Sequence, residues 1–269
     1  MMNSDIVKIV SDKPGPTLAI FAGVHGNETA GVFALNNMLP DLTILRGTLY
    51  VAFANLPAIE KNVRMIGKNL NRCFYKQNDG IEPEDIRARE LMAILDNCDA
   101  LLDLHMFYDN NGVPFVICEE NAIELAKVFN VDIISTNWTN VEPGGTDGYM
   151  YLSGKIGVCV ECGPIEKAAE YTSFAEQTIL QFLRYFNMTN SNVSYSNNVK
   201  RIITAQRAIL KTSHDFKLLD GYRNFQKLEA GQLIAKDEMR HYVAQQGECI
   251  IFPHYNARIG EEAYIIGKG

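Results

Sequence analysis

The sequence lacks the features that mark secreted and membrane proteins. Its first residues, Met1-Met-Asn-Ser-Asp-Ile6, contain neither the positive nor the apolar segment of a signal peptide, and no apolar run is long enough to span a bilayer. Positive charge is also scarce, because 32 acidic residues outnumber 25 basic ones and give a formal net charge of -7. This excess argues against nucleic acid or an anionic membrane surface as the main partner. We therefore expect a cytoplasmic protein with neither kind of partner.

Cysteine is present, but without the pattern of a disulfide framework. The six cysteines are scattered, mostly within apolar segments. Cys159 and Cys162 have C-x-x-C spacing, but their segment has the character of a β-strand, in which positions three apart face opposite sides. We expect all six to be reduced thiols that pack as small apolar residues.

The first two thirds of the chain alternate between strand-like and helix-like segments. Continuous apolar runs, typical of strands covered on both faces, occupy residues 18–24, 48–54, 100–105, 114–118 and 158–162. Helical patterns occupy residues 29–39, 83–95, 121–129 and 165–186. With 269 residues, 47% of them hydrophobic, the chain can bury a full core. The alternation predicts an α/β fold, a sheet flanked by helices.

A change of composition predicts a domain boundary near residue 190. Residues 187–198 are rich in Asn, Ser and Thr. After them come short strand-like pieces at 232–236, 241–244 and 248–252, separated by polar or glycine-containing turns. We expect a catalytic domain over residues 1–190 and a small, mainly β domain over residues 199–269.

Two apolar segments end in residue types that bind metal ions. His25 and Glu28 stand in a His-Gly-Asn-Glu run directly after residues 18–24, and His105 ends the run 101–105. Binding sites of open α/β sheets lie beyond the carboxyl ends of the strands, so these side chains can meet at one edge. Two imidazoles and one carboxylate are typical of catalytic zinc, which keeps a fourth position for water. A His-x-x-Glu run is common by chance, but with the second strand end it predicts one Zn²⁺ per chain, held by His25, Glu28 and His105.

Two further acids stand inside apolar strands close to these ligands. Asp103 lies two positions before His105, on the same strand face, where it can accept the ring N–H of a ligand imidazole. The alternative for Asp103 is an acid that caps a loop at the strand end. Glu161, in Val158-Cys-Val-Glu-Cys-Gly-Pro164, is costly to bury unless it is paired or functional. Beside a metal it is suited to be the general base that activates water, and the alternative is a structural acid paired with an arginine.

A polar segment before the second helix supplies candidate substrate-binding residues. Asn71 and Arg72, in Asn69-Leu-Asn-Arg-Cys-Phe74, suit the bidentate recognition of a carboxylate. Arg64, eight positions before Arg72, can polarise a scissile carbonyl or stabilise its oxyanion. The alternative is a surface loop whose arginines are solvated.

The ordered set of motifs H-G-N-E, N-L-N-R-C-F, D-L-H and V-E-C-G-P resembles the succinylglutamate desuccinylase/aspartoacylase family, within the zinc carboxypeptidase-like hydrolases. The resemblance implies a mixed sheet flanked by helices and a small C-terminal β domain that caps the substrate channel. It implies zinc ligation by His25, Glu28 and His105, and proton transfer by Glu161. Four further positions match substrate-contacting residues: Arg64 at the amide carbonyl, Asn71 and Arg72 at a carboxylate, and Tyr264 in the channel.

The sequence departs from the family at positions that bear on the substrate. Asn69 stands where the family often has aspartate. Asp147 and Tyr151 stand where aspartoacylases carry a tyrosine and an arginine that help to hold the aspartyl group. Hydrolysis of N-acetylaspartate is therefore not predicted, and the roles of Asp147 and Tyr151 stay open. The loop 143–148 either contacts a different substrate or is a flexible loop in which Thr146 or Asp147 caps a helix.

These observations predict a zinc-dependent amidohydrolase that removes the acyl group from an N-acyl amino acid or a related small amide. One alternative is a zinc metallocarboxypeptidase acting on short peptides, although a cap over the channel would exclude long chains. Another is a non-catalytic protein that binds a small carboxylate. The donor set does not exclude another divalent metal. The acyl group, the amine, the pathway and the oligomeric state, a homo-oligomer included, are left open.

Overall fold

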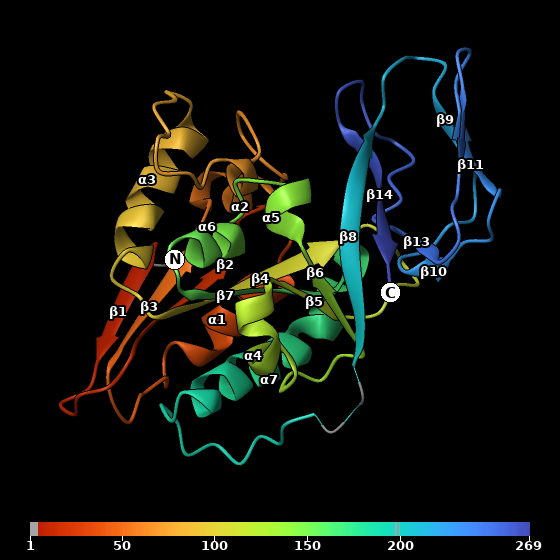
Figure 1. Cartoon of the computed structure of the whole chain (residues 1–269). Helices are drawn as coiled ribbons and strands as arrows, with labels where there is room; N and C mark the ends of the chain where they lie inside the picture. Colours follow the sequence, from red (N-terminus) through yellow and green to blue (C-terminus); the bar gives the residue numbers. More distant parts are fainter. Residues whose placement is uncertain (1–4, 197, 199) are drawn as a thin grey trace.

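The protein is built on one long twisted sheet. The computed structural model describes residues 5–196, 198 and 200–269, so residues 1–4 of the N-terminal segment and residues 197 and 199 of the expected boundary lie outside it. Within the described residues the sheet has 11 strands in the order β1-β3-β2-β4-β7-β5-β6-β8-β14-β13-β10 (Figure 1). Their bounds are β1 Ile6–Val10, β2 Thr17–Ala22, β3 Thr48–Phe53, β4 Ala100–Phe107, β5 Phe115–Cys118, β6 Ile133–Thr136, β7 Ile156–Pro164, β8 Arg201–Leu210, β10 Gln226–Lys227, β13 Glu248–Ile251 and β14 Glu262–Lys268.

The sheet is mixed, as expected. Strands β3, β2, β4 and β7 run parallel, whereas β5 pairs with β7 in the antiparallel sense. All eight residues of β4 are buried, which is why this strand has a continuous apolar character interrupted only by Asp103 and His105. The parallel strands at the centre bring their carboxyl ends to the same edge of the sheet.

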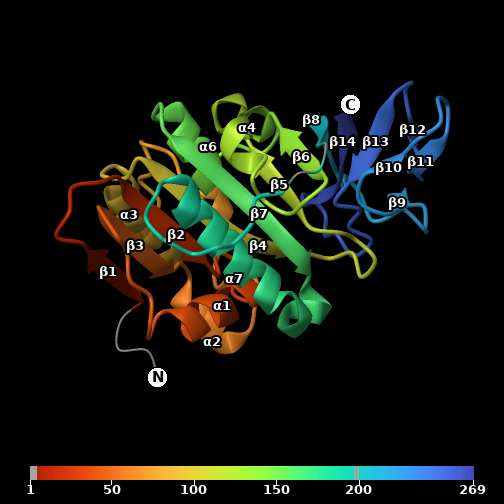
Figure 2. The same cartoon turned by 90° about the horizontal axis from the view of Figure 1, so that it is seen from below.

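Helices cover both faces of the sheet. Because strand side chains alternate, Leu18 and Ile20 of β2 pack on one face with residues of α1, α4 and α7, whereas Ala19 and Phe21 pack on the other with α3 and α6. Figures 1 and 2 show α1 and α7 side by side on the first face. The helices are α1 Ala30–Met38, α2 Leu56–Lys61, α3 Pro83–Leu95, α4 Ile123–Ala126, α5 Trp138–Val141, α6 Thr146–Leu152 and α7 Ala168–Tyr185, with short 3₁₀ turns η1 Leu70–Arg72, η2 Glu120–Ala122 and η3 Ile165–Lys167.

Most expected helices occur, with one clear difference. Helix α3 begins at Pro83, after a capping box in which Glu82 and Asp85 satisfy each other's backbone N–H groups. The helix expected over residues 121–129 is instead the 3₁₀ turn η2 followed by the single-turn α4. In the part of the chain that the structure describes, no helix has the length and apolar character needed to cross a membrane.

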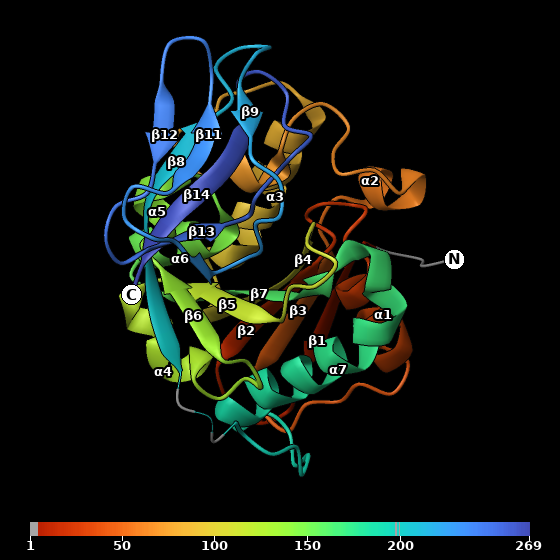
Figure 3. The same cartoon turned by 90° about the vertical axis from the view of Figure 1, so that its right-hand side faces the viewer.

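The C-terminal region is mainly β, as expected, and it continues the main sheet. Strand β8 lies parallel to β6 and carries β14, β13 and β10 in antiparallel pairing. A second small sheet, β12 His241–Val243, β11 Leu233–Lys236 and β9 Lys217–Leu218, packs beside it around a separate apolar core (Figure 3). A further apolar cluster that includes Phe115, Trp138, Ile203 and Ile265 joins this region to the main body. The joint holds the β region over the carboxyl ends of the central strands.

The cysteines follow the prediction. All six are free and buried. Cys159 packs on the face toward the C-terminal region and Cys162 on the opposite face, so the C-x-x-C spacing does not bring the two thiols together.

Candidate metal centre and active site

A tight loop places the first two candidate ligands. His25 and Glu28 lie between β2 and α1, and the Glu28 N–H donates to the His25 carbonyl (3.1 Å). Gly26 allows this turn to lie directly on α2, since a Cβ at that position would come within 2.1 Å of the carbonyl carbon of Ala58. The loop therefore points an imidazole and a carboxylate to the same side.

Neighbouring strands place the other two residues. His105 belongs to β4 and Glu161 to β7, and the two positions are direct partners in the parallel register. Both side chains consequently lie on the same face of the sheet, beside the β2–α1 loop. The carboxyl-end edge that the sequence predicts is where the four side chains meet.

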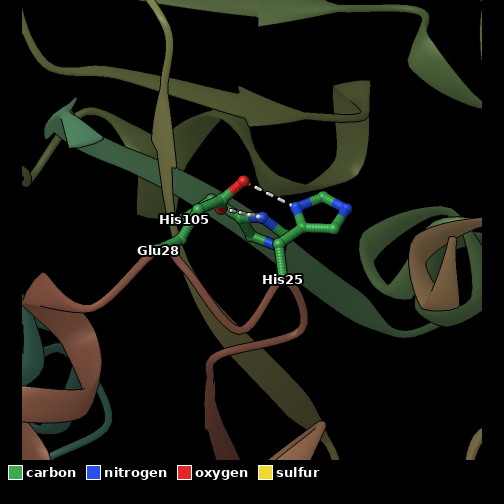
Figure 4. Close-up of side chains that lie close together, drawn as sticks. All are labelled: His25, Glu28 and His105. Atoms are coloured by element: carbon green, nitrogen blue, oxygen red, sulfur yellow. Dashed lines mark hydrogen bonds and ion pairs between the residues drawn. The ribbon is translucent and has the colours of Figure 1, made fainter. Parts of the chain in front are cut away.

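Glu28 stands between the two imidazoles (Figure 4). Its Oε1 lies 2.7 Å from His25 Nδ1, and its Oε2 lies 3.0 Å from His105 Nδ1. The two rings are nearly perpendicular, with centroids 5.2 Å apart. The three side chains are buried, and their potential ligand atoms lie within 4.8 Å of one another. This convergence is what a single metal ion requires.

The outer ring nitrogens are held by fixed acceptors. His25 Nε2 lies 2.9 Å from Asn69 Oδ1, an oxygen that also accepts the N–H of Asn71. His105 Nε2 lies 2.9 Å from Asp103 Oδ2, which in addition accepts the hydroxyl of Thr146 (2.6 Å). Each Nε2 must therefore carry a hydrogen, and each Nδ1 is the ring atom that faces Glu28 and could bind a metal.

The resulting donor set fits a metal cation. Burial, with a contribution from Arg64, lowers the pKa of His25 to about 4, so its Nδ1 lone pair faces a carboxylate oxygen at 2.7 Å with no proton between them. Burial alone would lower the pKa of His105, but Asp103 holds that pKa well above its usual range. A metal ion held by His25, Glu28 and His105 would remove the repulsion between the His25 lone pair and Glu28, and would take the place of the proton at His105.

Glu161 is close to this centre without being tied to it. The side chain is 6% exposed, and its Oε2 has no hydrogen-bond partner within the described part of the chain. Burial, followed by the charge of Glu28, raises the pKa of Glu161 well above its usual range. His105, Cys159 and Glu161 form a second group of potential ligands. Burial raises the pKa of the Cys159 thiol, however, which keeps the sulfur protonated and makes it a poor ligand.

A cavity of about 360 Å³ is lined by these residues and by the candidate substrate-binding residues. Arg64, Asn71 and Arg72 line it together with the three candidate ligands and Glu161. Arg64 Nη1 lies 3.0 Å from Glu28 Oε1. Asn71 Oδ1 accepts the N–H of Thr146 (3.1 Å), so its amide NH₂ remains the group it can offer to a ligand. Seven of the residues singled out from the sequence thus face one enclosed space.

Tyr264 is placed elsewhere. It is 1% exposed, packs in the apolar core of the C-terminal region and is not among the described residues that line the cavity. The reason is an irregularity in β14: the register shifts between Glu262 and Tyr264, so that Glu262 and Ile265 line the cavity while Tyr264 faces away. The expected position of Tyr264 in the channel is therefore not the one observed.

Several lining residues were not expected from the sequence. Glu142, beside Arg72, precedes α6. The C-terminal region contributes Phe252, His254, Glu261 and Glu262. His254 stacks on Tyr108 with ring centroids 6.0 Å apart, and the Tyr108 hydroxyl accepts from Asn27. Single acids and aromatic residues in loops carry no periodic signal, so only the packing of the two regions brings them here.

Asp147 and Tyr151, whose roles the sequence leaves open, lie in different surroundings. Asp147 lines the cavity. Tyr151, on the next turn of α6, is not among the described lining residues, and its hydroxyl lies 3.4 Å from Oε1 of the exposed Glu120. Thr146 is the first residue of α6, and Gly145 occupies the N-cap position. Neither Thr146 nor Asp147 therefore caps the helix.

The fold and the position of the cavity define the chain as an α/β protein with a candidate metal centre at the carboxyl ends of its central strands. Comparison with known families narrows the class. Residues 14–187 match the succinylglutamate desuccinylase/aspartoacylase catalytic domain, and residues 202–266 match the AstE/AspA barrel-sandwich hybrid domain. The chain belongs to the succinylglutamate desuccinylase/aspartoacylase family, as its motifs predict. The relatives are named for hydrolytic removal of acyl groups.

Individual relatives are distant but cover most of the chain. A probable aspartoacylase from Nostoc sp. is 24% identical over 92% of this chain and 92% of its own length. A succinylglutamate desuccinylase from Pseudoalteromonas atlantica is 26% identical over 96% of this chain and 82% of its own. The solved structure of succinylglutamate desuccinylase from Vibrio parahaemolyticus superposes with a TM-score of 0.80 at 16% identity, covering 98% of this chain and 86% of the other. This structural likeness concerns the fold alone.

Proposed function

We propose that the chain is a zinc-dependent amidohydrolase that removes the acyl group from an N-acyl amino acid or a related small amide with a carboxylate. The observation that carries the proposal is the meeting, in one cavity, of a His₂Glu donor set with the buried carboxyl group of Glu161, one oxygen of which has no partner among the described residues. Membership of a family of deacylases supports it. Neither domain of the pair is dispensable in this proposal, because both line the cavity.

His25, Glu28 and His105 would hold the zinc ion. Asn69 and Asp103 fix the orientation of the two rings through their outer nitrogens. When bound, zinc supplies a Lewis acid that activates water and polarises a carbonyl at neutral pH. The donor set leaves the side toward the cavity open, as a catalytic rather than a structural site requires.

Glu161 is the proposed general base and acid. Its partner-free Oε2 can accept a proton from the attacking water and then deliver that proton to the leaving amine nitrogen. The raised pKa suits the second half of this task, because a carboxyl group that holds its proton more firmly is the better donor near neutral pH. Arg64 lines the cavity beside Glu28, where its guanidinium can stabilise negative charge on the amide oxygen.

Asn71 and Arg72 are the proposed anchor for the carboxylate of the amino-acid part. Their fixed distance from the metal centre aligns the amide for attack. Phe252, His254 and Glu262 reach over the cavity from the C-terminal region, which favours small substrates over long peptides. Short peptides still belong in any test, because a carboxypeptidase could use the same centre.

The experiment is amine release by zinc-loaded protein from N-acyl amino acids and short peptides. The panel carries acetyl, succinyl and longer acyl groups on acidic, neutral and basic amino acids. The matched variant is Glu161→Gln, which keeps the shape of the side chain but cannot accept the proton. We expect it to retain one zinc per chain, measured by elemental analysis, and to lose about a hundredfold or more in kcat.

The outcomes separate the candidates. Cleavage of acyl amino acids alone, dependent on Glu161, supports the deacylase. Cleavage of peptides with a free carboxyl end would assign a carboxypeptidase to the same centre. Full turnover in Glu161→Gln would remove Glu161 from the mechanism. Tight binding of acyl amino acids without turnover in wild-type protein would point to a non-catalytic binding protein.

A further inference from the structure

The cavity carries far more negative than positive charge. Among the described residues that line it, six are acidic and only two are arginines. The acids are Glu28, Glu142, Asp147, Glu161, Glu261 and Glu262. Glu28 and Glu161 belong to the proposed metal centre, so four acids have no part in the reaction as proposed above. With the two charges of the proposed Zn²⁺ counted, four positive charges still face six acids, so a second substrate carboxylate is disfavoured here.

Neither arginine is free to offset these acids. Arg72 Nη2 forms an ion pair with Glu142 and lies 3.8 Å from Glu262, while its Nη1 donates to the backbone carbonyl of Asn71 (2.8 Å). Arg64 contacts Glu28. A substrate carboxylate at Asn71 and Arg72 would share Arg72 with these acids, and a second carboxylate would find no uncompensated side-chain cation among the described lining residues.

Asp147 is the acid that most needs a positive partner. The residue is 6% exposed and lines the cavity, yet its Oδ2 has no hydrogen-bond partner among the residues that the structure describes. One backbone N–H, that of Gly148, donates to the carboxylate. Burial raises the pKa of Asp147 to about 6. A buried carboxylate in this state is costly, and a cation in the cavity would relieve the cost.

Asp147 and Asn71 border the same small space. Gly145 lies between them, and a Cβ there would stand 2.9 Å from Asp147 Oδ1 and 3.6 Å from Asn71 Oδ1. The absence of a side chain at Gly145 keeps this space open. A ligand whose carboxylate is held at Asn71 can thus bring a nearby group to Asp147.

Two other roles for Asp147 do not fit its position. It is in neither of the groups of described residues whose ligand atoms converge on a possible metal position. It also does not cap α6, whose N-cap residue is Gly145. What remains is a buried carboxylate that lines the ligand cavity and has one oxygen without a partner among the described residues.

We propose that the substrate is an N-acyl amino acid whose side chain carries a positive charge, an ammonium or a guanidinium, and that Asp147 binds this charge. The inference rests on the proposed deacylase function and names its substrate class. Glu142 and Glu262 add to the negative potential around the same group. Asp147 is then the specificity-determining residue.

The test compares three N-acetyl amino acids of matched length with zinc-loaded protein. Nα-acetyl-lysine carries the cation, N-acetylnorleucine is its neutral analogue, and N-acetylglutamate carries a second carboxylate. A charge-assisted hydrogen bond corresponds to about a tenfold to a hundredfold preference in kcat/KM for the lysine compound over the norleucine compound. We expect the glutamate compound to be the poorest of the three.

The variant Asp147→Asn keeps the volume and removes the charge. It should abolish most of the lysine-over-norleucine preference, chiefly by lowering kcat/KM for Nα-acetyl-lysine. Glu120→Gln, an exposed acid at η2 outside the cavity, is the matched control and should leave the preference unchanged. Equal or better cleavage of the neutral or acidic compound by wild-type protein overturns the proposal, as does an unchanged preference in Asp147→Asn.

A binding measurement keeps the inference testable if none of the acyl compounds is cleaved. Calorimetric affinities of free lysine, norleucine and glutamate are then compared in wild-type and Asp147→Asn protein. A preference for lysine that the variant loses supports the cation site even though the deacylase proposal fails. No preference for lysine in wild-type protein rejects the cation site independently of any reaction.

Discussion

Exchanging the partners of the two candidate zinc-binding histidines tests the architecture of the centre. The outer nitrogen of His105 donates to a carboxylate, Asp103, whereas that of His25 donates to an amide, Asn69, at the same distance of 2.9 Å. The variant Asp103→Asn gives His105 the kind of partner that His25 has, and Asn69→Asp does the reverse. Both substitutions preserve side-chain size and an acceptor oxygen, so they change the charge behind one ligand and little else.

The expected effects have opposite signs. Loss of an outer partner of a ligand imidazole typically weakens metal binding tenfold to a hundredfold, or about 1.4 to 2.8 kcal/mol. We expect Asp103→Asn to reach this range, because Asp103 is fully buried and its charge is unscreened. Asn69→Asp should tighten zinc binding by about tenfold or less, since Asn69 is only half-buried and water screens part of the added charge.

The assay is competition for zinc with a chromophoric chelator, with circular dichroism to verify folding. Asp99→Asn is the matched control: Asp99 directly precedes the same strand, but its carboxylate accepts the N–H of Thr17 at the far end of the sheet. Its zinc affinity should equal that of wild-type protein. The reasoning fails if Asp103→Asn binds zinc as tightly as wild type, or if both exchanges shift the affinity in the same direction.

Three further predictions address the loop, the metal and the C-terminal region. Gly26→Ala should lower the free energy of unfolding by about 1 to 3 kcal/mol and should also weaken zinc binding, because the added Cβ would come within 2.1 Å of the Ala58 backbone. Wild-type values of both quantities, measured by denaturant unfolding and zinc titration, would show that the loop accommodates the methyl group. Removing zinc with a chelator should lower Tm by roughly 5 °C or more, as expected for a ligand present at about 100 times its Kd, and a Tm independent of zinc would argue against a bound metal. Tyr264→Phe should leave kcat and KM unchanged, since Tyr264 lies outside the cavity. A rise in KM with kcat unchanged would show that Tyr264 contacts the substrate after all.

The parts of the site that the sequence predicts share a physical cause. Strands β2, β4 and β7 are buried on both faces, so polar residues stand out at their carboxyl ends, and parallel strands bring those ends together. His105 and Glu161 follow from this rule, and so does the pairing of Asp103 with His105. The loop residues Arg64, Asn71 and Arg72 were found through their motif, and the structure places them in the same cavity.

Other features carry no local signal. The side to which Tyr264 points depends on an irregularity in β14 that alternation along a strand cannot anticipate. The parallel pairing of β8 with β6 joins segments more than 60 residues apart, and it decides that the C-terminal strands extend the main sheet. The expected helix over residues 121–129 is a 3₁₀ turn followed by a single α-helical turn, a division that the apolar pattern of the segment does not reveal.

The sequence by itself determined the α/β class, the mixed sheet with its small β region, and which residues are candidates for metal and proton chemistry, because burial and strand ends restrict where such side chains can stand. Only the tertiary structure decided the charge of the cavity. Glu142 and Asp147 lie close together in the sequence, whereas Glu262 comes from β14, and each alone has the appearance of an ordinary surface or helix-start acid. Their shared potential arises when α6 and β14 are brought around one space, since electrostatic interaction depends on distance in space and on burial, neither of which the order of residues specifies.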